Sequence, residues 1–235
     1  MSQPPLFNCD TPEPILAMDQ LPVHCNVLWP TREGALTAPR GDIHLTYLPG
    51  CGHIYNSAFD PDLMTYTQAY ENSLHFSARF QEYATSLAER LIATYDLQNK
   101  DIVEIGSGQG DFLKLMCWMG DNRGVGFDPS YVEKEAAGNT AVSFVQAFYS
   151  EEFADYPADF ICCRHVLEHI HEPVLFLQTV KRAINGRTDT IVFFEVPNVL
   201  WTVRQMGIWD IIYEHCSYYS PVSLAHLFTQ AGFEV

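Results

Sequence analysis

The segment Tyr213-Glu214-His215 places three groups that can donate, accept or move protons next to one another in the sequence. Histidine has the ordinary pKa closest to neutrality among ionisable side chains, so His215 is a candidate general base. Tyr213 can donate a hydrogen bond to an oxygen on which negative charge develops, and Glu214 can orient His215 or bind a hydroxyl group. Alternatively, the segment is a buried aromatic lid in which His215 packs against Trp209.

A second set of titratable side chains follows the apolar residues 160–163 and comprises Arg164, His165, Glu168 and His169. Their spacing differs from the H-E-x-x-H pattern of zinc hydrolases, so it predicts a lining of the site rather than a metal centre. We expect His169 to donate a hydrogen bond to the developing negative charge. We expect Arg164 and His165 to lie near a bound cofactor. Alternatively, Glu168 and His169 simply pair at the start of a helix.

A glycine-rich loop lies in the segment Val103-Glu104-Ile105-Gly106-Ser107-Gly108-Gln109-Gly110. Glycines at alternate positions let the backbone turn sharply and come close to a ligand. The dinucleotide-binding fingerprint needs its third glycine one position later, where this chain has Asp111. A phosphate-binding P-loop would need a Gly-Lys-Ser/Thr sequence, which the loop lacks. The loop therefore favours a different cofactor.

Two acidic residues accompany this loop. Asp128 ends the next apolar stretch, where its carboxylate can accept hydrogen bonds from both hydroxyls of a ribose. Glu104 lies inside an apolar stretch, where a charged side chain usually has a function. The backbone of Gly106, Ser107, Gly108 and Gly110, near the N-terminus of a helix, can hold a carboxylate group of the ligand.

The elements that must position these residues alternate between strand and helix. The sequence predicts strands at 102–105, 124–127, 142–145, 160–163 and 190–196, and helices at 77–96, 112–119, 173–184 and 220–232. We expect residues 233–235 to begin a sixth strand. This alternation predicts an α/β fold with a parallel sheet, helices on both faces, and ligands at the carboxyl ends of the strands.

The glycine loop with Glu104 and Asp128 resembles motif I and the acidic residue after strand two of the class I S-adenosylmethionine-dependent methyltransferases. The resemblance implies their Rossmann-like fold and S-adenosylmethionine as cofactor. Enzymes of this class often carry an aspartate after strand three that accepts the adenine amino group. This chain has Gln146-Ala147-Phe148 there, so either the side-chain carbonyl of Gln146 or stacking on Phe148 would contact the adenine.

The remaining motifs are similar to those of more specific methyltransferases. Residues 165–170 resemble the H-x-L-E-H-I segment of small-molecule methyltransferases, and residues 213–215 resemble the Y-E-H segment of the sugar C-methyltransferases. The resemblance covers most of the chain. It implies methylation of a carbon alpha to a keto group on a nucleotide-linked sugar, with His215 removing the proton.

Residues 1–65 form the first predicted domain, a small loop-rich and β-rich module, and residues 66–235 form the methyltransferase domain. The module of the sugar C-methyltransferases binds zinc through two Cys-x-x-Cys pairs. Each pair has lost a member here, because Pro12 follows Cys9 and Leu48 precedes Cys51 at that spacing. Four zinc ligands would have to come from Cys9, Cys51, His53 and either Cys25 or His24. We predict that the module keeps its shape without zinc.

The composition limits partners and location. A net charge of −16 disfavours nucleic acid and anionic membranes, because phosphate groups bind to basic surfaces. The seven cysteines are scattered and odd in number, which indicates no disulfide framework. With no signal peptide and no apolar run long enough to span a bilayer, we expect a cytoplasmic protein that acts on a small molecule. The oligomeric state stays open.

Two other functions and one structural question stay open. The protein can methylate oxygen or nitrogen on another metabolite, or it can bind S-adenosylmethionine without catalysis. Class I methyltransferases usually have seven strands, the last two forming an antiparallel hairpin at the sheet edge. Because this chain reaches only the start of strand six, we expect its C-terminal strands to be truncated. Either the chain is a fragment, or the edge of its sheet is built differently.

Overall fold

The computed structural model describes residues 11–25, 27–64, 77–133 and 141–235. Contacts divide the chain into two compact units. The first comprises Met1–Thr65, His165–Lys181 and Val196–Val235, and the second comprises Tyr66–Arg164 and Arg182–Glu195. The predicted division into domains of residues 1–65 and 66–235 stays a prediction. No helix in the described ranges is long and apolar enough to cross a membrane.

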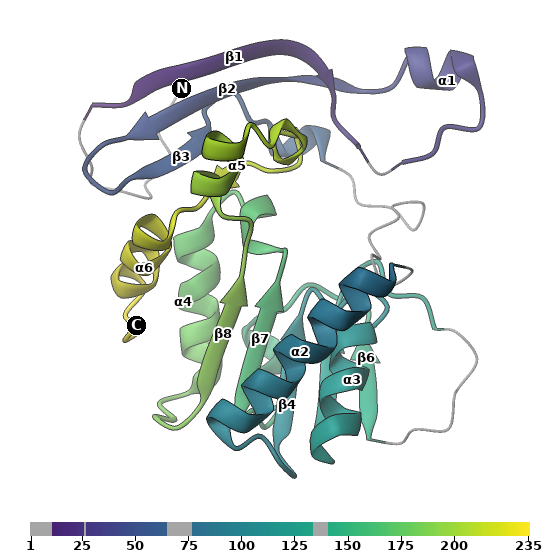
Figure 1. The fold of residues 1–235 in the computed structure, drawn as a ribbon, viewed down its shortest axis with the longest axis vertical. Helices are drawn as coiled ribbons and strands as arrows, with labels where there is room; N and C mark the ends of the chain where they lie inside the picture. The colour runs from purple at the N-terminus through teal and green to yellow at the C-terminus, as the bar shows by residue number, and fades with distance from the viewer. Residues whose placement is uncertain (1–10, 26, 65–76, 134–140) are drawn as a thin grey trace. The chain divides into compact units, whose positions relative to one another are not determined.

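The second unit contains the predicted parallel sheet, whose five strands have the order β6-β5-β4-β7-β8 (Figure 1). The strands are β4 (Asp101–Ile105), β5 (Arg123–Phe127), β6 (Val142–Val145), β7 (Phe160–Arg164) and β8 (Ile191–Glu195). All neighbouring pairs are parallel. The helices of this unit are α2 (Ala78–Tyr95), α3 (Asp111–Gly120) and η2 (Glu151–Phe153). The predicted α/β fold with a parallel sheet flanked by helices is therefore confirmed.

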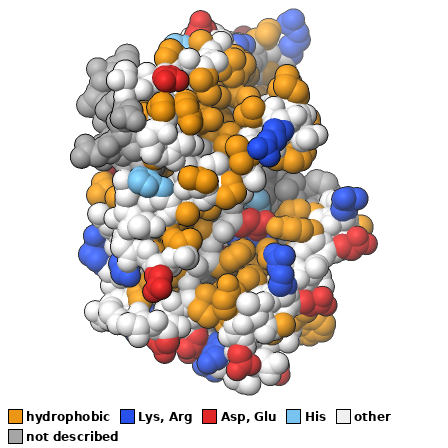
Figure 2. Space-filling model, turned by 60° about the vertical axis from the view of Figure 1, so that its left-hand side comes forward, with side chains coloured by type: hydrophobic (Ala, Val, Ile, Leu, Met, Phe, Trp, Pro, Cys, Tyr) orange, Lys and Arg blue, Asp and Glu red, His pale blue; other side chains and the backbone are white. Residues whose placement is uncertain are grey.

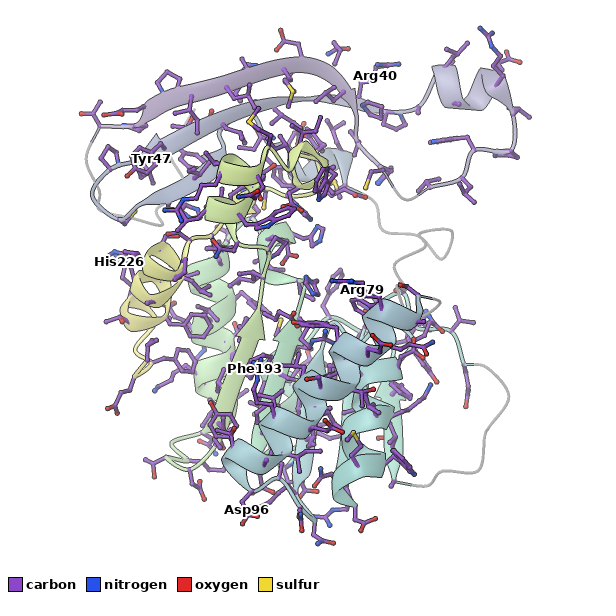
Figure 3. All side chains as sticks on the ribbon, in the orientation of Figure 1. Arg40, Tyr47, Arg79, Asp96, Phe193 and His226 are labelled. Carbon is purple, nitrogen blue, oxygen red and sulfur yellow. The ribbon has the colours of Figure 1, made fainter. Side chains whose placement is uncertain are left out.

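Helices α2 and α3 pack on the sheet through a shared apolar core. Helix α2 begins where the Ser77 side chain accepts a hydrogen bond from the Phe80 amide, and it ends at Asp96 in a left-handed conformation. Phe193 of β8, labelled in Figure 3, stacks on Phe160 of β7 with ring centroids 6.2 Å apart. The buried residues of this core are Ala84, Leu87, Ala88, Leu91, Leu97, Ile102, Phe112, Leu113, Met116, Cys117, Phe160 and Cys162.

The first unit is built on an antiparallel sheet of four strands in the order β1-β2-β3-β9. Strands β1 (Glu13–Pro22), β2 (Arg40–Leu48) and β3 (His53–Asn56) come from the predicted module. Strand β9 (Ser217–Tyr218) comes from the far end of the chain and pairs with β3, with Tyr55 opposite Ser217. The residues just before β9 are Tyr213-Glu214-His215, so this pairing joins the predicted catalytic segment to the N-terminal module.

The remaining helices are short, and most belong to the first unit. They are α1 (Arg32–Leu36), η1 (Pro61–Leu63), η3 (Leu167–His169), α5 (Val199–Gln205), η4 (Ile208–Asp210) and α6 (Pro221–Gln230). Helix α4 (Pro173–Ile184) begins in the first unit and ends in the second. Helix α6 starts with a capping box in which Ser220 and Ser223 exchange hydrogen bonds, which confirms the predicted start.

The prediction that residues 233–235 begin a strand is wrong. Gly232 turns the chain with a φ of 85°, and the amide of Phe233 then donates to the carbonyl of Phe228, 3.0 Å away. The Phe233 ring packs on Phe228 and also lies 4.9 Å from the ammonium of Lys181. These residues therefore cap α6, because the Phe233 amide satisfies a helix carbonyl and not a strand partner.

Candidate functional site

The glycine loop connects β4 to α3 in the second unit. Gly106, Gly108 and Gly110 have φ angles of 70°, 54° and 78°, which residues with a side chain rarely adopt. A Cβ atom added to Gly110 would lie 2.1 Å from the ring of Phe144. Both the backbone conformation and the space around it therefore require glycine at position 110.

Hydrogen bonds join this loop to the end of β5. The amides of Gly106 and Ser107 both donate to the carbonyl of Phe127, at 2.8 and 3.2 Å. The amide of Gly108 donates to Oδ2 of Asp128 at 2.8 Å. These three hydrogen bonds hold the loop against the end of β5.

Asp128 has a structural role that the sequence did not reveal. Its Oδ1 atom accepts hydrogen bonds from the amide and hydroxyl of Ser130, at 2.7 and 2.6 Å. With the Gly108 amide, three of the roughly four acceptor positions of the carboxylate are occupied. The predicted contact with both ribose hydroxyls stays a prediction, and this count leaves room for about one further hydrogen bond.

Glu104 is buried in β4 with 3% of its surface exposed. Burial raises the pKa of its carboxyl to about 8, although the positive charge of Arg164 acts in the opposite direction. Within the described part of the chain, its Oε2 atom has no hydrogen-bond partner. Glu104 is thus a buried acceptor that can bind a cationic group of a ligand.

Arg164 lies at the end of β7 and is held from two sides. Its Nε atom donates to Oε2 of Glu195 at 2.6 Å, and its guanidinium lies 3.9 Å from the ring centre of Phe112. Glu195 also accepts a hydrogen bond from the hydroxyl of Tyr83. Sequence reasoning missed Glu195 and Tyr83, although Glu195 is the last residue of its strand and Asp128 directly follows its own.

The second unit therefore offers groups of opposite charge to a ligand. Besides Oε2 of Glu104, buried Nη2 of Arg164 and Oγ of Ser107 have no hydrogen-bond partner among the described residues. An amino acid group fits this set, since its ammonium would pair with Glu104 and its carboxylate with Arg164 and the loop. The methionine part of S-adenosylmethionine has this chemistry.

The adenine contact remains a choice between two residues. Gln146 donates a long hydrogen bond of 3.3 Å from Nε2 to the carbonyl of Pro129. Phe148 is 70% exposed, which leaves its ring accessible for stacking. Neither the carbonyl contact of Gln146 nor stacking on Phe148 is tested by these positions.

In the first unit, Tyr213 is buried against residues that precede it by more than 150 positions. Its hydroxyl accepts from the amide of Asp60 at 2.9 Å and donates to the carbonyl of the same residue at 3.3 Å. Its ring stacks on Phe59, and a Cβ atom added to Gly41 would lie 2.1 Å from it. These contacts make Tyr213 an anchor of the segment, and its role as a donor to substrate stays a prediction.

Glu214 is fully buried and contacts the N-terminal module. Its Oε2 atom accepts a hydrogen bond from Sγ of Cys25 at 2.8 Å, and its Oε1 atom lies 3.7 Å from Nδ1 of His24. Partial burial, followed by the hydrogen bond and charge of Glu214, raises the pKa of Cys25 to about 12, so Cys25 acts as a thiol donor. Cys25 and His24 thus contact the two carboxylate oxygens of Glu214, and its predicted role in orienting His215 stays a prediction.

His169 and His215 lie edge to face with ring centroids 4.8 Å apart. Nδ1 of His169 is 2.9 Å from the carbonyl of Glu214, and Nδ1 of His215 is 2.9 Å from the carbonyl of Asp210. A carbonyl only accepts, so both Nδ1 atoms carry a proton, and in the neutral form of either ring the lone pair lies on Nε2. Burial lowers the pKa of His169 to about 4, which keeps its ring neutral at pH 7.

The ring contacts of His215 differ from the packing against Trp209 that the aromatic-lid alternative predicts. Among the described residues, its ring contacts are with His169 and with Tyr218, at 6.2 Å. Trp209 instead contacts Trp201, at 5.6 Å, and is 65% exposed. His215 is therefore packed by neighbours that are themselves polar.

Glu168 completes this cluster and is 2% exposed. Its Oε1 atom lies 3.8 Å from Nδ1 of His165. Burial alone would raise the pKa of this carboxyl, but the hydrogen bond from His165 and the electrostatic interactions with the neighbouring histidines lower it below the ordinary value. His165 lies in the first unit with Glu168, and its predicted cofactor contact stays a prediction.

The candidate zinc residues that the structure describes each contact different groups. Cys9 lies outside the described residues. Sγ of Cys51 is 3.8 Å from the carbonyl of Leu48, and Cys25 is hydrogen-bonded to Glu214. Burial lowers the pKa of His53 to about 3, and its ring lies near Tyr55 and Tyr219. In the described ranges, the groups of possible metal ligands do not include Cys25, Cys51 or His53.

Comparisons with known proteins agree on one enzyme class. A family described as a methyltransferase domain matches residues 76–235. The chain is 28% identical to the tRNA U34 carboxymethyltransferase of Nautilia profundicola over 109 residues, which is 41% of this chain and 35% of that protein. It is 28% identical to the C-methyltransferase NovU of Streptomyces niveus over 142 residues, which is 57% of this chain and 33% of that protein. The matches thus span about a third of the length of these relatives.

A solved structure of similar fold is the mycolic acid cyclopropane synthase CmaA1 complexed with SAH. It has a TM-score of 0.51 and 20% sequence identity, and the match covers 75% of this chain and 69% of that one. At this identity the likeness concerns the fold alone.

Replacing Gly110 with alanine tests the packing of the loop against Phe144. Gly186 is a matched control, because its φ of 76° is similar but no atom lies within 4 Å of an added Cβ. We expect Gly186→Ala to lower the free energy of unfolding by about 1–2 kcal/mol, from backbone strain alone. Gly110→Ala should cost about 1–3 kcal/mol more, because of the clash. Equal losses in urea denaturation would contradict the role of Phe144.

Replacing Glu104 with glutamine tests the raised pKa. Because the folded pKa of about 8 lies above the ordinary 4.5, the folded state holds a proton that the unfolded state releases between these values. The wild type should lose stability across this window as pH rises, by up to about 1.4 kcal/mol per pH unit from this group. We expect the difference from Glu104→Gln in urea denaturation to change with pH. Glu89→Gln, at an exposed site, is the control against which this pH dependence is compared, and a constant difference for Glu104→Gln would refute the assignment.

Proposed function

Since the chain belongs to the family of methyltransferase domains, we propose that it transfers a methyl group from S-adenosylmethionine to a small-molecule acceptor. One observation carries the proposal: the glycine loop is hydrogen-bonded to Asp128 and lies in the same unit as the unpaired polar atoms of Glu104 and Arg164. These groups suit the ribose and the amino acid part of the cofactor. When bound, the cofactor supplies an electrophilic methyl group on a sulfonium.

In this proposal the chain's own residues hold the two ends of the cofactor. Asp128 accepts a hydrogen bond from the ribose, and the loop amides and Arg164 bind the carboxylate. Glu104 binds the ammonium, whose charge favours loss of the carboxyl proton. Gln146 or Phe148 contacts the adenine.

For the acceptor we propose a carbon alpha to a keto group, on a nucleotide-linked sugar. The similarity to a C-methyltransferase supports this, as does the tautomer of His215, whose Nε2 lone pair can take the alpha proton. The carbanion then forms the new carbon–carbon bond to the methyl group. The carbon–sulfur bond breaks, S-adenosylhomocysteine leaves, and His215 later releases its proton to water.

A tRNA acceptor is the second candidate, because one relative is a tRNA carboxymethyltransferase. The charge of −16 argues against it. On the face shown in Figure 2, the Lys and Arg side chains are scattered among other types and form no continuous basic surface. The small-molecule acceptor is therefore our choice. We also propose a cytoplasmic location, which the scattered and odd-numbered cysteines of the sequence support.

Replacing His215 with alanine tests the proposed base. We expect turnover to fall about 10²- to 10⁴-fold, the usual contribution of a positioned base, with cofactor affinity changed less than about twofold. The measurement is release of S-adenosylhomocysteine in a screen of nucleotide-linked keto sugars, other metabolites and tRNA. His226→Ala is the matched control, because this half-buried histidine of α6, labelled in Figure 3, is hydrogen-bonded to Gln230.

Undiminished turnover in the His215→Ala variant would remove His215 from the mechanism. Turnover on a hydroxyl or amine acceptor, with none on keto sugars, would replace carbon methylation with oxygen or nitrogen methylation. Cofactor binding without turnover on any acceptor would leave a binding protein.

A further inference from the structure

Glu168, His169 and His215 form a cluster that sequence spacing did not predict. Each residue offers one ligand atom, and these atoms all lie within 4.8 Å of one another. Glu168 and His169 belong to η3, whereas His215 lies just before β9. All three belong to the first unit, so their arrangement does not depend on how the two units are placed.

The two imidazoles are oriented as metal ligands usually are. In metal sites, a histidine ligand typically donates its other ring N–H to a carbonyl or carboxylate, which fixes the tautomer. Here the carbonyls of Glu214 and Asp210 accept from the Nδ1 atoms of His169 and His215, both at 2.9 Å. Each ring therefore presents a lone pair on Nε2.

Glu168 supplies a charge that is otherwise incompletely balanced. The residue is 2% exposed, and its Oε2 atom has no hydrogen-bond partner in the part of the chain that the structure describes. A buried carboxylate oxygen without a donor costs several kcal/mol in a protein interior, unless a cation approaches it. The cluster thus brings a buried carboxylate together with two imidazole nitrogens, a donor set that suits a dication.

We propose that Glu168, His169 and His215 bind a divalent transition-metal ion of the zinc, cobalt or nickel class. Imidazole nitrogen and carboxylate oxygen are ligands that these ions accept. Bonds of about 2.1 Å would bring tetrahedral ligand atoms about 3.4 Å apart, so the side chains must close in around the ion. Three protein ligands leave a further position for water, as in sites that exchange their ions.

The ion and the substrate proton would compete for the same lone pair of His215. This consequence rests on the proposed function: with the ion bound, His215 could not act as a base, and metal would inhibit methyl transfer. The binding itself does not rest on it. An experiment without any methyl acceptor therefore separates the two proposals.

A titration of the full chain with Co²⁺, after chelator treatment, tests the site. We expect one equivalent to bind with visible ligand-field bands. His169→Ala and His215→Ala should each weaken binding at least about 100-fold, since loss of supporting groups alone costs 10- to 100-fold. Glu168→Gln should weaken it at least about tenfold. His44→Ala is the control, because His44 belongs with Asp19 and Asp42 to a second, more exposed group of possible ligands. The affinity of the His44→Ala variant for Co²⁺ should differ from that of the wild type by less than about twofold.

No Co²⁺ binding to the wild type would overturn the proposal, as would binding that survives His215→Ala or is lost in His44→Ala. Circular dichroism identifies any variant that fails to fold. Nitrogen-15 spectra of the histidines in the wild-type chain, with and without Zn²⁺, need no variant. We expect Zn²⁺ to shift the Nε2 signals of two histidines whose Nδ1 atoms stay protonated. Shifts confined to exposed histidines would refute the site.

Discussion

A buried carboxylate must be given hydrogen-bond donors or a positive charge, and this constraint shapes both candidate sites. Asp128 meets it with backbone amides and the Ser130 hydroxyl, and in doing so fixes the glycine loop. Glu214 meets it at one oxygen only, which accepts from the Cys25 thiol, and this hydrogen bond joins the segment before β9 to the N-terminal module. Glu104 meets it by holding a proton, since burial raises its pKa to about 8. Glu168 is the contrasting case, because the neighbouring histidines lower its pKa despite equally deep burial. The same side chain thus serves as a neutral acid in the sheet and as an anion beside imidazoles.

The sequence was sufficient for the parallel sheet, and the reason is local. The strands around Glu104 and Asp128 are short apolar runs bounded by glycines or helix starts, and such patterns follow from neighbouring residues alone. Helix α6 was equally predictable, because Ser220 and Pro221 carry a start signal in their own side chains. The error at residues 233–235 has the same origin: Phe233 looks like the start of a strand but instead packs on Phe228, which a local pattern cannot distinguish.

The candidate sites were less predictable, because their geometry depends on contacts between distant residues. Strand β9 has two residues, too few for any periodic signal, and it is defined only by its pairing with β3. A metal-binding motif such as H-E-x-x-H is recognised from residues close together in the sequence. Glu168 and His169 are adjacent, but the third member of their cluster, His215, lies 46 positions after His169. The side chain of Glu214 contacts Cys25, 189 positions earlier in the chain, and no local pattern indicates this contact. Glycine spacing revealed the loop, and only the structure revealed that Asp128 holds it.

The pairing of β3 with β9 also orders events during synthesis. Strands β1, β2 and β3 leave the ribosome first and can pair with one another as a meander. Ile54 of β3 can pair with Tyr218 of β9 only after Tyr218 has been synthesised. Until then, β3 presents an open strand edge on a nascent chain, which invites pairing with other chains. The intervening sheet of the second unit has all its strands available by Glu195 and can therefore form earlier. A denatured chain diluted from urea starts with both partners present and is under no such order, so vectorial folding and refolding reach the same sheet by different routes.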